Sequence, residues 1–411
     1  MESVYGLLGE RLKHSLSPQI HKYLCGYDYS LFEMPEGDVE AFIKKAEFSA
    51  INVTIPYKKE VMSYLHRIDN FAKKIGSVNT VKKEKDGTLS GYNTDYFGFM
   101  YLLKRNGIDV KNKKAIILGS GGSAVTVKAV LTDEGAKSIT FISRSGEDNY
   151  QNISRHFDAE IIVNTTPVGM YPKNLEAPIN LCDFKKAEAV VDIIYNPLKT
   201  KLLLDAEKLG IKHSNGLSML VAQAKMAAEI FIDKKIPDSE IERVLSLMER
   251  DSKNIILIGM PGCGKSTIAQ ILGEKLNRNV VDTDDMIVEK AQKNIPEIIE
   301  KDGEEVFRKI ECECAFSAGQ KLSQIIATGG GIIKKRENFL SLRQNGFVVF
   351  LERDLEKLSL KGRPLSKNLD NLKVMYKERY PLYNEIKDVT VRVENTPEEA
   401  AEEIIKLFSE V

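Results

Sequence analysis

The sequence lacks tryptophan, has few cysteines and contains no long apolar run. Its five cysteines are odd in number and scattered, which indicates neither a disulfide framework nor a metal-ligand set. No apolar stretch approaches the roughly 20 residues that cross a bilayer, and the N-terminus shows no signal-peptide pattern. These absences predict a cytoplasmic protein with reduced thiols and no membrane partner.

An excess of charge of either sign is also lacking. Lysine plus arginine and aspartate plus glutamate number 59 each. This balance removes the usual reason to expect a nucleic-acid partner. The length of 411 residues, with 43% hydrophobic and 29% charged residues, is typical of a globular chain of two or three domains.

Apolar strand candidates alternate with helical segments in both halves of the chain. Residues 114–215 and 254–411 each show this alternation, which predicts α/β domains with parallel sheets. Residues 216–232 have helical spacing and are expected to return to a mixed N-terminal block of residues 1–105. The polar stretch "RDSKN" at 250–254 predicts a short joint between the halves.

The second half opens with a phosphate-binding loop. Residues 259–266 fit G-x-x-x-x-G-K-[ST], directly after an apolar strand and before a helical pattern. In such a loop backbone N–H groups converge on phosphate, Lys265 reaches the β and γ phosphates, and Ser266 supplies an oxygen to Mg²⁺. The predicted ATP-binding residues here are Gly262, Cys263, Gly264, Lys265, Ser266 and Thr267.

Further motifs in this half resemble shikimate kinase over essentially all of residues 254–411. They are "DTDD" (282–285), "GEEVFRKIE" (303–311), "TGGG" (328–331), "GRPL" (362–365) and "RYPLY" (379–383). The resemblance implies ATP-dependent phosphorylation of shikimate, which carries one carboxylate and three hydroxyls. Planar guanidinium groups suit such a carboxylate.

The same resemblance implies a role for individual residues of the kinase half. Arg308 and Arg379 would bind the carboxylate, and Asp284 would bind the attacked hydroxyl and accept its proton. Gly330 would let the backbone approach the ring. Asp282 would support Mg²⁺ beside Ser266, and Arg363 would lie on a lid that closes over the ATP phosphates.

The first half carries a different glycine loop. Residues 119–124, "GSGGSA", satisfy G-x-G-x-x-G/A between a strand and a helix. An NAD site would carry an acidic residue about 20 residues further on. This chain instead has Arg144, which suits a 2′-phosphate and favours NADP. The cofactor-binding residues predicted from this pattern are Gly119, Gly121, Gly122, Ser123, Ala124 and Arg144.

Other motifs of this half resemble shikimate dehydrogenase from residue 3 to about residue 248. They are "HSLSPQIH" (14–21), "NVTIPYK" (52–58), "SVNT" (77–80), "GYNTD" (91–95) and "NGLSMLVAQA" (215–224). The resemblance implies Lys58 and Asp95 as the catalytic pair that donates a proton to the reduced ketone of 3-dehydroshikimate. It further implies substrate binding by Ser15, Ser17, Thr54, Asn79, Tyr195 and Gln223, and a cofactor cleft lined by Thr165, Ile193 and Gly216.

The resulting expectation is an α/β chain of three domains. They are a substrate-binding domain of residues 1–105 with 216–250, a Rossmann NADP-binding domain of residues 106–215, and a P-loop kinase domain of residues 253–411 with a parallel sheet. The expected enzyme is bifunctional: it reduces 3-dehydroshikimate with NADPH and then phosphorylates shikimate with ATP and Mg²⁺. Two alternatives stay open: an NAD-dependent quinate/shikimate dehydrogenase fused to a kinase, and a scaffold or binding protein with one inactive half.

Overall fold

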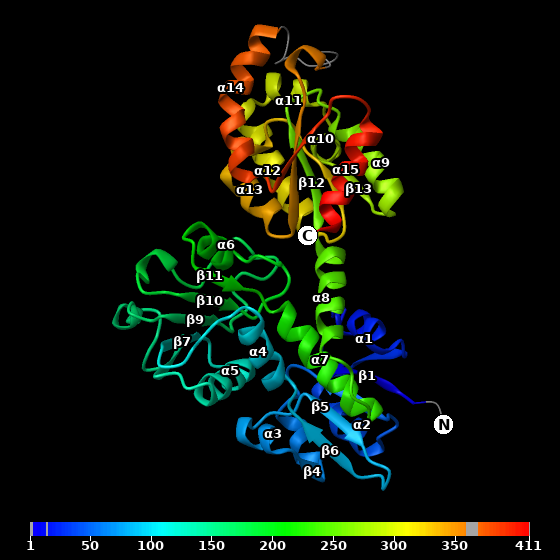
Figure 1. The fold of residues 1–411 in the computed structure, drawn as a ribbon, viewed down its shortest axis with the longest axis vertical. Coiled ribbons are helices and arrows are strands. Elements are labelled where there is room, and N and C mark those ends of the chain that lie inside the picture. The colour runs from blue at the N-terminus through cyan, green and yellow to red at the C-terminus, as the bar shows by residue number, and fades with distance from the viewer. Residues whose placement is uncertain (1–2, 14, 359–368, 411) are drawn as a thin grey trace. The chain divides into compact units, whose positions relative to one another are not determined.

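The computed structural model describes residues 3–13, 15–358 and 369–410 (Figure 1). Arg363, predicted as the lid residue, lies outside the described residues. The chain forms two compact units. Unit 1 comprises Met1–Val168, Ala177–Tyr195 and Leu202–Met248, and unit 2 comprises Gly169–Glu176, Asn196–Lys201 and Glu249–Val411.

The first sheet of unit 1 has six strands in the order β2-β1-β3-β5-β6-β4, and β5 runs antiparallel to both of its neighbours. Its strands are β1 (Tyr5–Gly9), β2 (Tyr29–Glu33), β3 (Ala50–Val53), β4 (Arg67–Ile68), β5 (Thr80–Lys83) and β6 (Leu89–Tyr92). Its helices are α1 (Ser17–Cys25), α2 (Val39–Lys45), α3 (Asn70–Ile75) and α4 (Asp95–Arg105). Because of the β5 direction, the end of β1, the end of β3, the start of β5 and the end of β6 share one edge of the sheet.

The second sheet of unit 1 is parallel, in the order β11-β10-β9-β7-β8. Its strands are β7 (Lys114–Leu118), β8 (Ser138–Ile142), β9 (Ile161–Asn164), β10 (Ala189–Asp192) and β11 (Lys212–Ser214). The helices that follow in this part of the chain are α5 (Gly122–Asp133), α6 (Lys201–Lys208), α7 (Leu217–Ile232) and α8 (Ser239–Ser252). Strands β9 and β10 are buried along their whole length, as is typical of parallel sheets covered on both faces.

Unit 2 contains one parallel sheet in the order β13-β14-β12-β15-β16. Its strands are β12 (Asn254–Gly259), β13 (Val280–Asp282), β14 (Ile325–Ala327), β15 (Gly346–Glu352) and β16 (Val389–Arg392). Its helices are α9 (Lys265–Leu276), α10 (Thr283–Ala291), α11 (Ile295–Lys301), α12 (Glu304–Gln320), α13 (Arg336–Arg343), α14 (Leu369–Ile386) and α15 (Pro397–Ser409). The parallel α/β architecture predicted for both halves is confirmed.

The predicted polar joint is mostly helical. Helix α8 continues to Ser252, and Lys253 alone separates it from β12. Arg278 provides hydrogen-bond donors for carbonyls at the C-terminal end of this helix. Its guanidinium donates to the carbonyls of Lys253 at 2.8 Å and Arg250 at 2.9 Å. Helix ends leave carbonyls without intrahelical partners, and a basic side chain nearby stabilises them.

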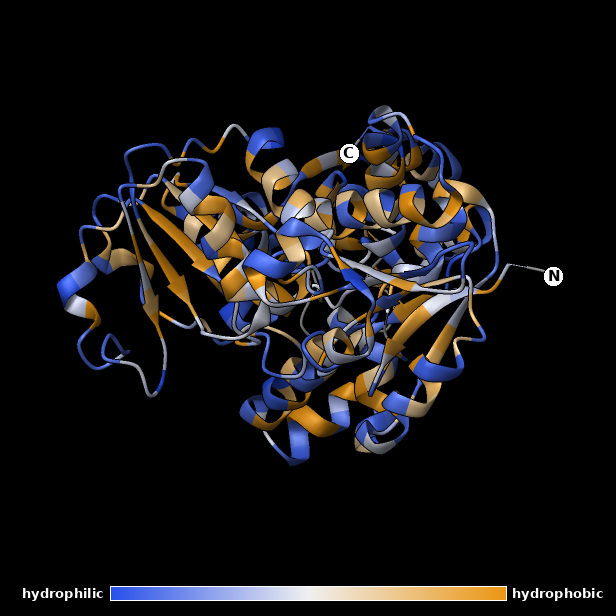
Figure 2. Cartoon of the chain, turned by 90° about the horizontal axis from the view of Figure 1, so that it is seen from below, coloured by the Kyte–Doolittle hydropathy of each residue, from blue (hydrophilic) through white to orange (hydrophobic). Residues whose placement is uncertain are grey.

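Several strands are hydrophobic along most of their length and appear orange in Figure 2, whereas many helices mix hydrophobic and hydrophilic residues. Separate clusters of buried residues lie on the two faces of the second sheet and around the sheet of unit 2. Among the described residues, no helix combines the length and the apolar character that a membrane crossing requires.

Candidate active sites

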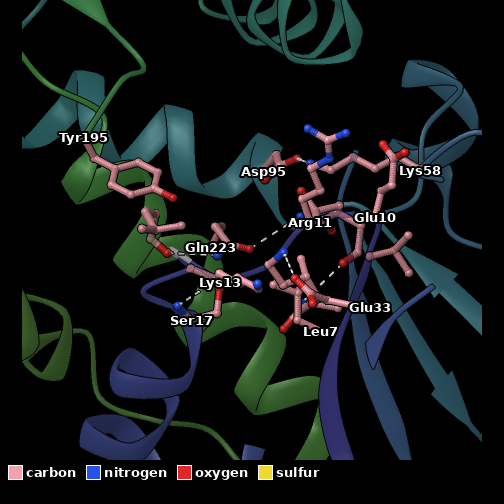
Figure 3. Close-up of a pocket in the computed structure, with 17 residues that line it drawn as sticks. Leu7, Glu10, Arg11, Lys13, Ser17, Glu33, Lys58, Asp95, Tyr195 and Gln223 are labelled. Atoms are coloured by element: carbon pink, nitrogen blue, oxygen red, sulfur yellow. Dashed lines mark hydrogen bonds and ion pairs between the residues drawn. The ribbon is translucent and has the colours of Figure 1, made fainter. Parts of the chain in front are cut away.

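A cavity of about 620 Å³ lies at the shared edge of the first sheet of unit 1 (Figure 3). Its walls come from the segments after β1 and β3, from the residue before β5, from the start of α4 and from α7. All eight residues predicted for catalysis and substrate binding in the first half of the chain line it: Ser15, Ser17, Thr54, Lys58, Asn79, Asp95, Tyr195 and Gln223.

Lys58 and Asp95 form an ion pair in this cavity. Lys58 Nζ donates to Asp95 Oδ2 at 2.6 Å, and the two side chains are 21% and 13% exposed. Asp95 is the first residue of α4, where the helix dipole favours a carboxylate. An ammonium held by a carboxylate at the wall of a cavity can hydrogen-bond a developing oxyanion and deliver a proton to it.

A buried amide and hydroxyl network surrounds Thr94, the residue directly before Asp95. Asn79 Oδ1 accepts from Thr94 N at 2.8 Å, and Asn79 Nδ2 donates to Thr94 Oγ1 at 3.0 Å. Thr94 Oγ1 in turn donates to Gln223 Oε1 at 3.2 Å. These bonds fix the rotamers of Asn79 and Gln223, so both amides are preorganised for a polar ligand.

The glycine loop of unit 1 connects β7 to α5. Gly119 has φ of +106°, and a Cβ added there would lie 2.8 Å from Thr165 Oγ1. A Cβ added at Gly121 or Gly122 would meet nothing within 4 Å. The loop is therefore closed on the Thr165 side and open on the other side, and an open loop at a helix N-terminus fits the pyrophosphate of a dinucleotide.

The other predicted cofactor residues lie on segments that follow or flank the strands of the second sheet of unit 1. A Cβ added at Gly216 would lie 1.9 Å from Ile193 O, so these two backbones are in close contact. Arg144 is exposed and follows β8, the neighbour of β7. Its loop is closed by a hydrogen bond from Ser143 N to Asp148 O at 3.2 Å and by the contact of Asp148 with His156 Nε2 at 2.7 Å.

The phosphate loop of unit 2 connects β12 to α9. Lys265, which is 8% exposed, donates through Nζ to the carbonyls of Gly259 and Met260, each at 3.0 Å. Ser266 Oγ, in α9, donates to Oδ2 of Asp282, the last residue of β13, at 2.7 Å. A hydroxyl beside a carboxylate at a phosphate loop is the ligand set that Mg²⁺ takes in P-loop enzymes, so these residues fit that ion.

The predicted acceptor-site residues gather around the glycine turn at 328–331, which follows β14. Gly330 O accepts from Arg379 Nη1 at 2.8 Å. Arg308 Nη1 contacts Gly331 O at 3.4 Å, and a Cβ added at Gly329 would lie 2.4 Å from Asp284 Oδ1. The glycines thus allow Asp284, Arg308 and Arg379 to surround one backbone turn.

The two arginines differ in how far their charge is already neutralised. Arg308 pairs with Glu311 at 2.9 Å and with Glu304 at 3.1 Å. Arg379 is 5% exposed, makes no ion pair with any described carboxylate, and has a buried Nε without a hydrogen-bond partner there. Glu311 is near enough for the Arg379 charge to oppose the rise that burial causes in its pKa, but these two described residues form no direct ion pair. A buried guanidinium without a direct ion pair is costly unless a ligand anion pairs with it.

Asp284 is held in a partly buried, negatively charged setting. Burial and, to a smaller extent, the neighbouring Asp282 carboxylate raise its pKa to about 6, while Lys265 acts in the opposite direction. A carboxylate with a pKa close to the working pH can accept a proton efficiently.

Several charged residues of the first cavity were not predicted from the sequence. They are Glu10, Arg11, Lys13 and Glu33. They belong to no functional motif, and only the chain path that brings the β1 and β2 ends together places them in the cavity. Their only signal in the sequence is their position just before "HSLSP" or at a strand end.

Comparison with protein families gives a match in each half of the chain. Residues 7–81 match the shikimate dehydrogenase substrate binding domain, and residues 261–409 match shikimate kinase. The shikimate dehydrogenase (NADP(+)) of Clostridium beijerinckii is 39% identical over 269 residues, which are 61% of this chain and 99% of that protein.

Solved structures resemble the first half. A chorismate mutase/shikimate 5-dehydrogenase fusion protein from Clostridium acetobutylicum is 38% identical, with a TM-score of 0.58 over 61% of this chain and 98% of that one. The shikimate 5-dehydrogenase of Thermus thermophilus, solved with NADP(H) and shikimate, is 28% identical, with a TM-score of 0.54 over 59% and 98% of the two chains. The chain therefore belongs to the shikimate dehydrogenase family and is an enzyme that joins such a dehydrogenase to a shikimate kinase domain.

Proposed function

We propose that this enzyme reduces 3-dehydroshikimate to shikimate with NADPH and then transfers the γ-phosphoryl group of ATP to shikimate, with Mg²⁺ as the metal. The single observation that carries the first step is the Lys58–Asp95 ion pair in a cavity that six further predicted substrate-binding residues line. This substrate and cofactor class agrees with the shikimate dehydrogenase (NADP(+)) of Clostridium beijerinckii and with the Thermus thermophilus enzyme solved with NADP(H) and shikimate.

In the dehydrogenase, NADPH supplies the hydride when it is bound. Lys58 donates a hydrogen bond to the substrate ketone and passes a proton to the oxygen as negative charge develops there. Asp95 orients the ammonium through the 2.6 Å contact. Asn79 and Gln223, fixed through Thr94, bind ring hydroxyls, and the hydroxyls of Ser15 and Ser17 bind the carboxylate.

In the kinase, ATP supplies the phosphoryl group and Mg²⁺ neutralises its charge when both are bound. Ser266 and Asp282 would hold the metal, and Lys265 would contact the terminal phosphates. Asp284 accepts the proton of the attacking hydroxyl. Arg379 and Arg308 orient shikimate by its carboxylate.

A coupled assay tests the proposal. The full chain is supplied with 3-dehydroshikimate, NADPH, ATP and Mg²⁺, and NADPH loss and ADP formation are followed together. ADP formation is expected to depend on prior NADPH oxidation unless shikimate is added. An enzyme that oxidises quinate with NAD⁺ faster than shikimate with NADP⁺ would instead establish the alternative dehydrogenase.

Arg144→Asp is expected to lower the preference for NADPH over NADH by about a hundredfold, since it removes a charge-assisted contact to the 2′-phosphate and adds a carboxylate that repels it. The ratio of kcat/KM for the two cofactors measures this change. Arg155→Asp places the same charge change on another exposed arginine of this region and should leave the ratio unaltered. A wild-type enzyme that already prefers NADH would contradict the role of Arg144.

Arg379→Met is expected to raise the KM for shikimate in the kinase reaction by about ten- to a hundredfold, because a buried charge-assisted contact to the carboxylate is lost. The KM for ATP should stay unchanged. Lys377→Met, on the exposed face of the same helix α14, is the matched control. Because a buried residue is removed, circular dichroism of the variant must match the wild type. Equal effects on both substrates would point to a structural role.

A further inference from the structure

Two cations of the dehydrogenase cavity, Arg11 and Lys13, are not used by the mechanism above. Lys13 lines the cavity together with Ser15 and Ser17, and it is exposed. Among the residues that the structure describes, Lys13 makes no ion pair. The local backbone turns tightly here, since Ser15 N donates to Leu12 O at 2.9 Å and Ser17 N donates to Ser15 Oγ at 3.2 Å. Lys13 is therefore held on the short segment that also presents the two serines.

None of the other charged residues of the cavity forms an ion pair with Lys13 in the described part of the chain. Lys58 and Asp95 are paired with each other, and Glu33 accepts a hydrogen bond from Leu12 N. Glu10 and Arg11 also line the cavity. In Figure 3 the guanidinium of Arg11 lies on the side of Asp95, whereas Lys13 lies on the side of Ser17 and Gln223. Lys13 is thus the cation at the serine end of the cavity.

The serine end is where the substrate carboxylate is placed in the proposed function. Two neutral hydroxyls can donate hydrogen bonds to that carboxylate, but they carry no charge to compensate it. An ammonium in the same segment supplies the opposite charge, and charge-assisted hydrogen bonds are about twice as strong as neutral ones. The cavity is open to solvent around Lys13, so the gain is that of a partly hydrated pair.

We infer that Lys13 is a further substrate-binding residue of the dehydrogenase, which pairs with the substrate carboxylate beside Ser15 and Ser17 and selects carboxylate-bearing rings. This inference rests on the proposed dehydrogenase reaction. It applies to the oxidation of shikimate as well as to the reduction of 3-dehydroshikimate, because both carry the carboxylate.

Lys13→Met tests the inference in the full chain, with shikimate oxidation by NADP⁺ as the readout. At low ionic strength the KM for shikimate should rise about fivefold, as expected for a partly exposed ion pair, with little change in kcat. At about 1 M salt, where the screening length is about 3 Å, most of this difference should disappear. Lys13→Arg should keep a KM near that of the wild type.

Two comparisons separate charge pairing from a structural effect. Lys22→Met removes an exposed lysine of α1 and should leave the KM unchanged. The neutral carboxamide of shikimate should show the same KM with the wild type and with Lys13→Met. An equal KM for shikimate in Lys13→Met and Lys22→Met overturns the inference, as does an equal effect of Lys13→Met on shikimate and its carboxamide. If the wild type fails to oxidise shikimate, the proposed function itself is wrong.

Discussion

Lys58→Met is expected to abolish NADPH oxidation nearly completely while phosphorylation of added shikimate continues at the wild-type rate. Lys58 is the only proton donor assigned to the ketone oxygen, and a positioned general acid contributes about 10²- to 10⁴-fold to a rate. Methionine keeps the length of the side chain but loses both the proton and the pair with Asp95. The steady-state rates of NADPH oxidation and of shikimate phosphorylation, measured on the same preparation, test both expectations.

The neighbouring lysine provides the control for this variant. Lys59 is exposed and lies outside the cavity, so Lys59→Met should keep both activities. A Lys58→Met protein that loses the kinase activity as well would show that the substitution damages folding. A Lys58→Met protein that still reduces 3-dehydroshikimate well would show that another group donates the proton.

Asp284→Asn is expected to lower kcat for shikimate phosphorylation by about 10²- to 10⁴-fold, because the amide cannot accept the proton of the attacking hydroxyl. ATP binding should persist, since the phosphate loop at 259–266 is unchanged. Binding of ATP measured by calorimetry and kcat measured with saturating shikimate separate the two effects. Asp285 is an exposed carboxylate one residue further on, and Asp285→Asn should keep kcat close to that of the wild type.

The pH profile of the kinase gives a second test of Asp284. Burial raises the pKa of this carboxyl to about 6, so the carboxylate form is present above this pH and is lost as the pH falls through it. The wild-type kcat/KM should therefore decrease on the acid side with an apparent pKa near 6. In Asp284→Asn this limb should be missing from the residual rate. The same acid limb in both proteins would assign the titration to another group.

Much of the fold follows from local patterns in the sequence. The apolar runs at 114–118 and 254–259 predict buried strands, and both are strands that end at a glycine loop. The pattern "TPEE" at 396–399 is typical of a helix start, and α15 begins there with the Thr396 hydroxyl accepting from Glu399 N at 3.2 Å. These features depend on neighbours within a few residues, so the sequence order alone specifies them.

Long-range features could not be predicted in the same way. The antiparallel direction of β5 decides that Asn79 faces the segment after β3, and nothing in a strand of four residues signals its direction. The motifs identified Lys58, Asp95 and their partners, yet they contain no information on Lys13 or Glu33. Those side chains line the cavity because the order of the strands in the sheet brings their segments together, and that order is a property of the whole sheet.

Helix α8 has a consequence for how this enzyme can be divided. Its residues up to Met248 belong to unit 1, and those from Glu249 belong to unit 2. The final carbonyls of the helix are held by Arg278, and β12 starts two residues after the helix ends. A cut between residues 248 and 249 would therefore fall inside a helix and not in an extended segment of the kind that proteases prefer. A gene divided at this place would encode two products that each carry only part of α8.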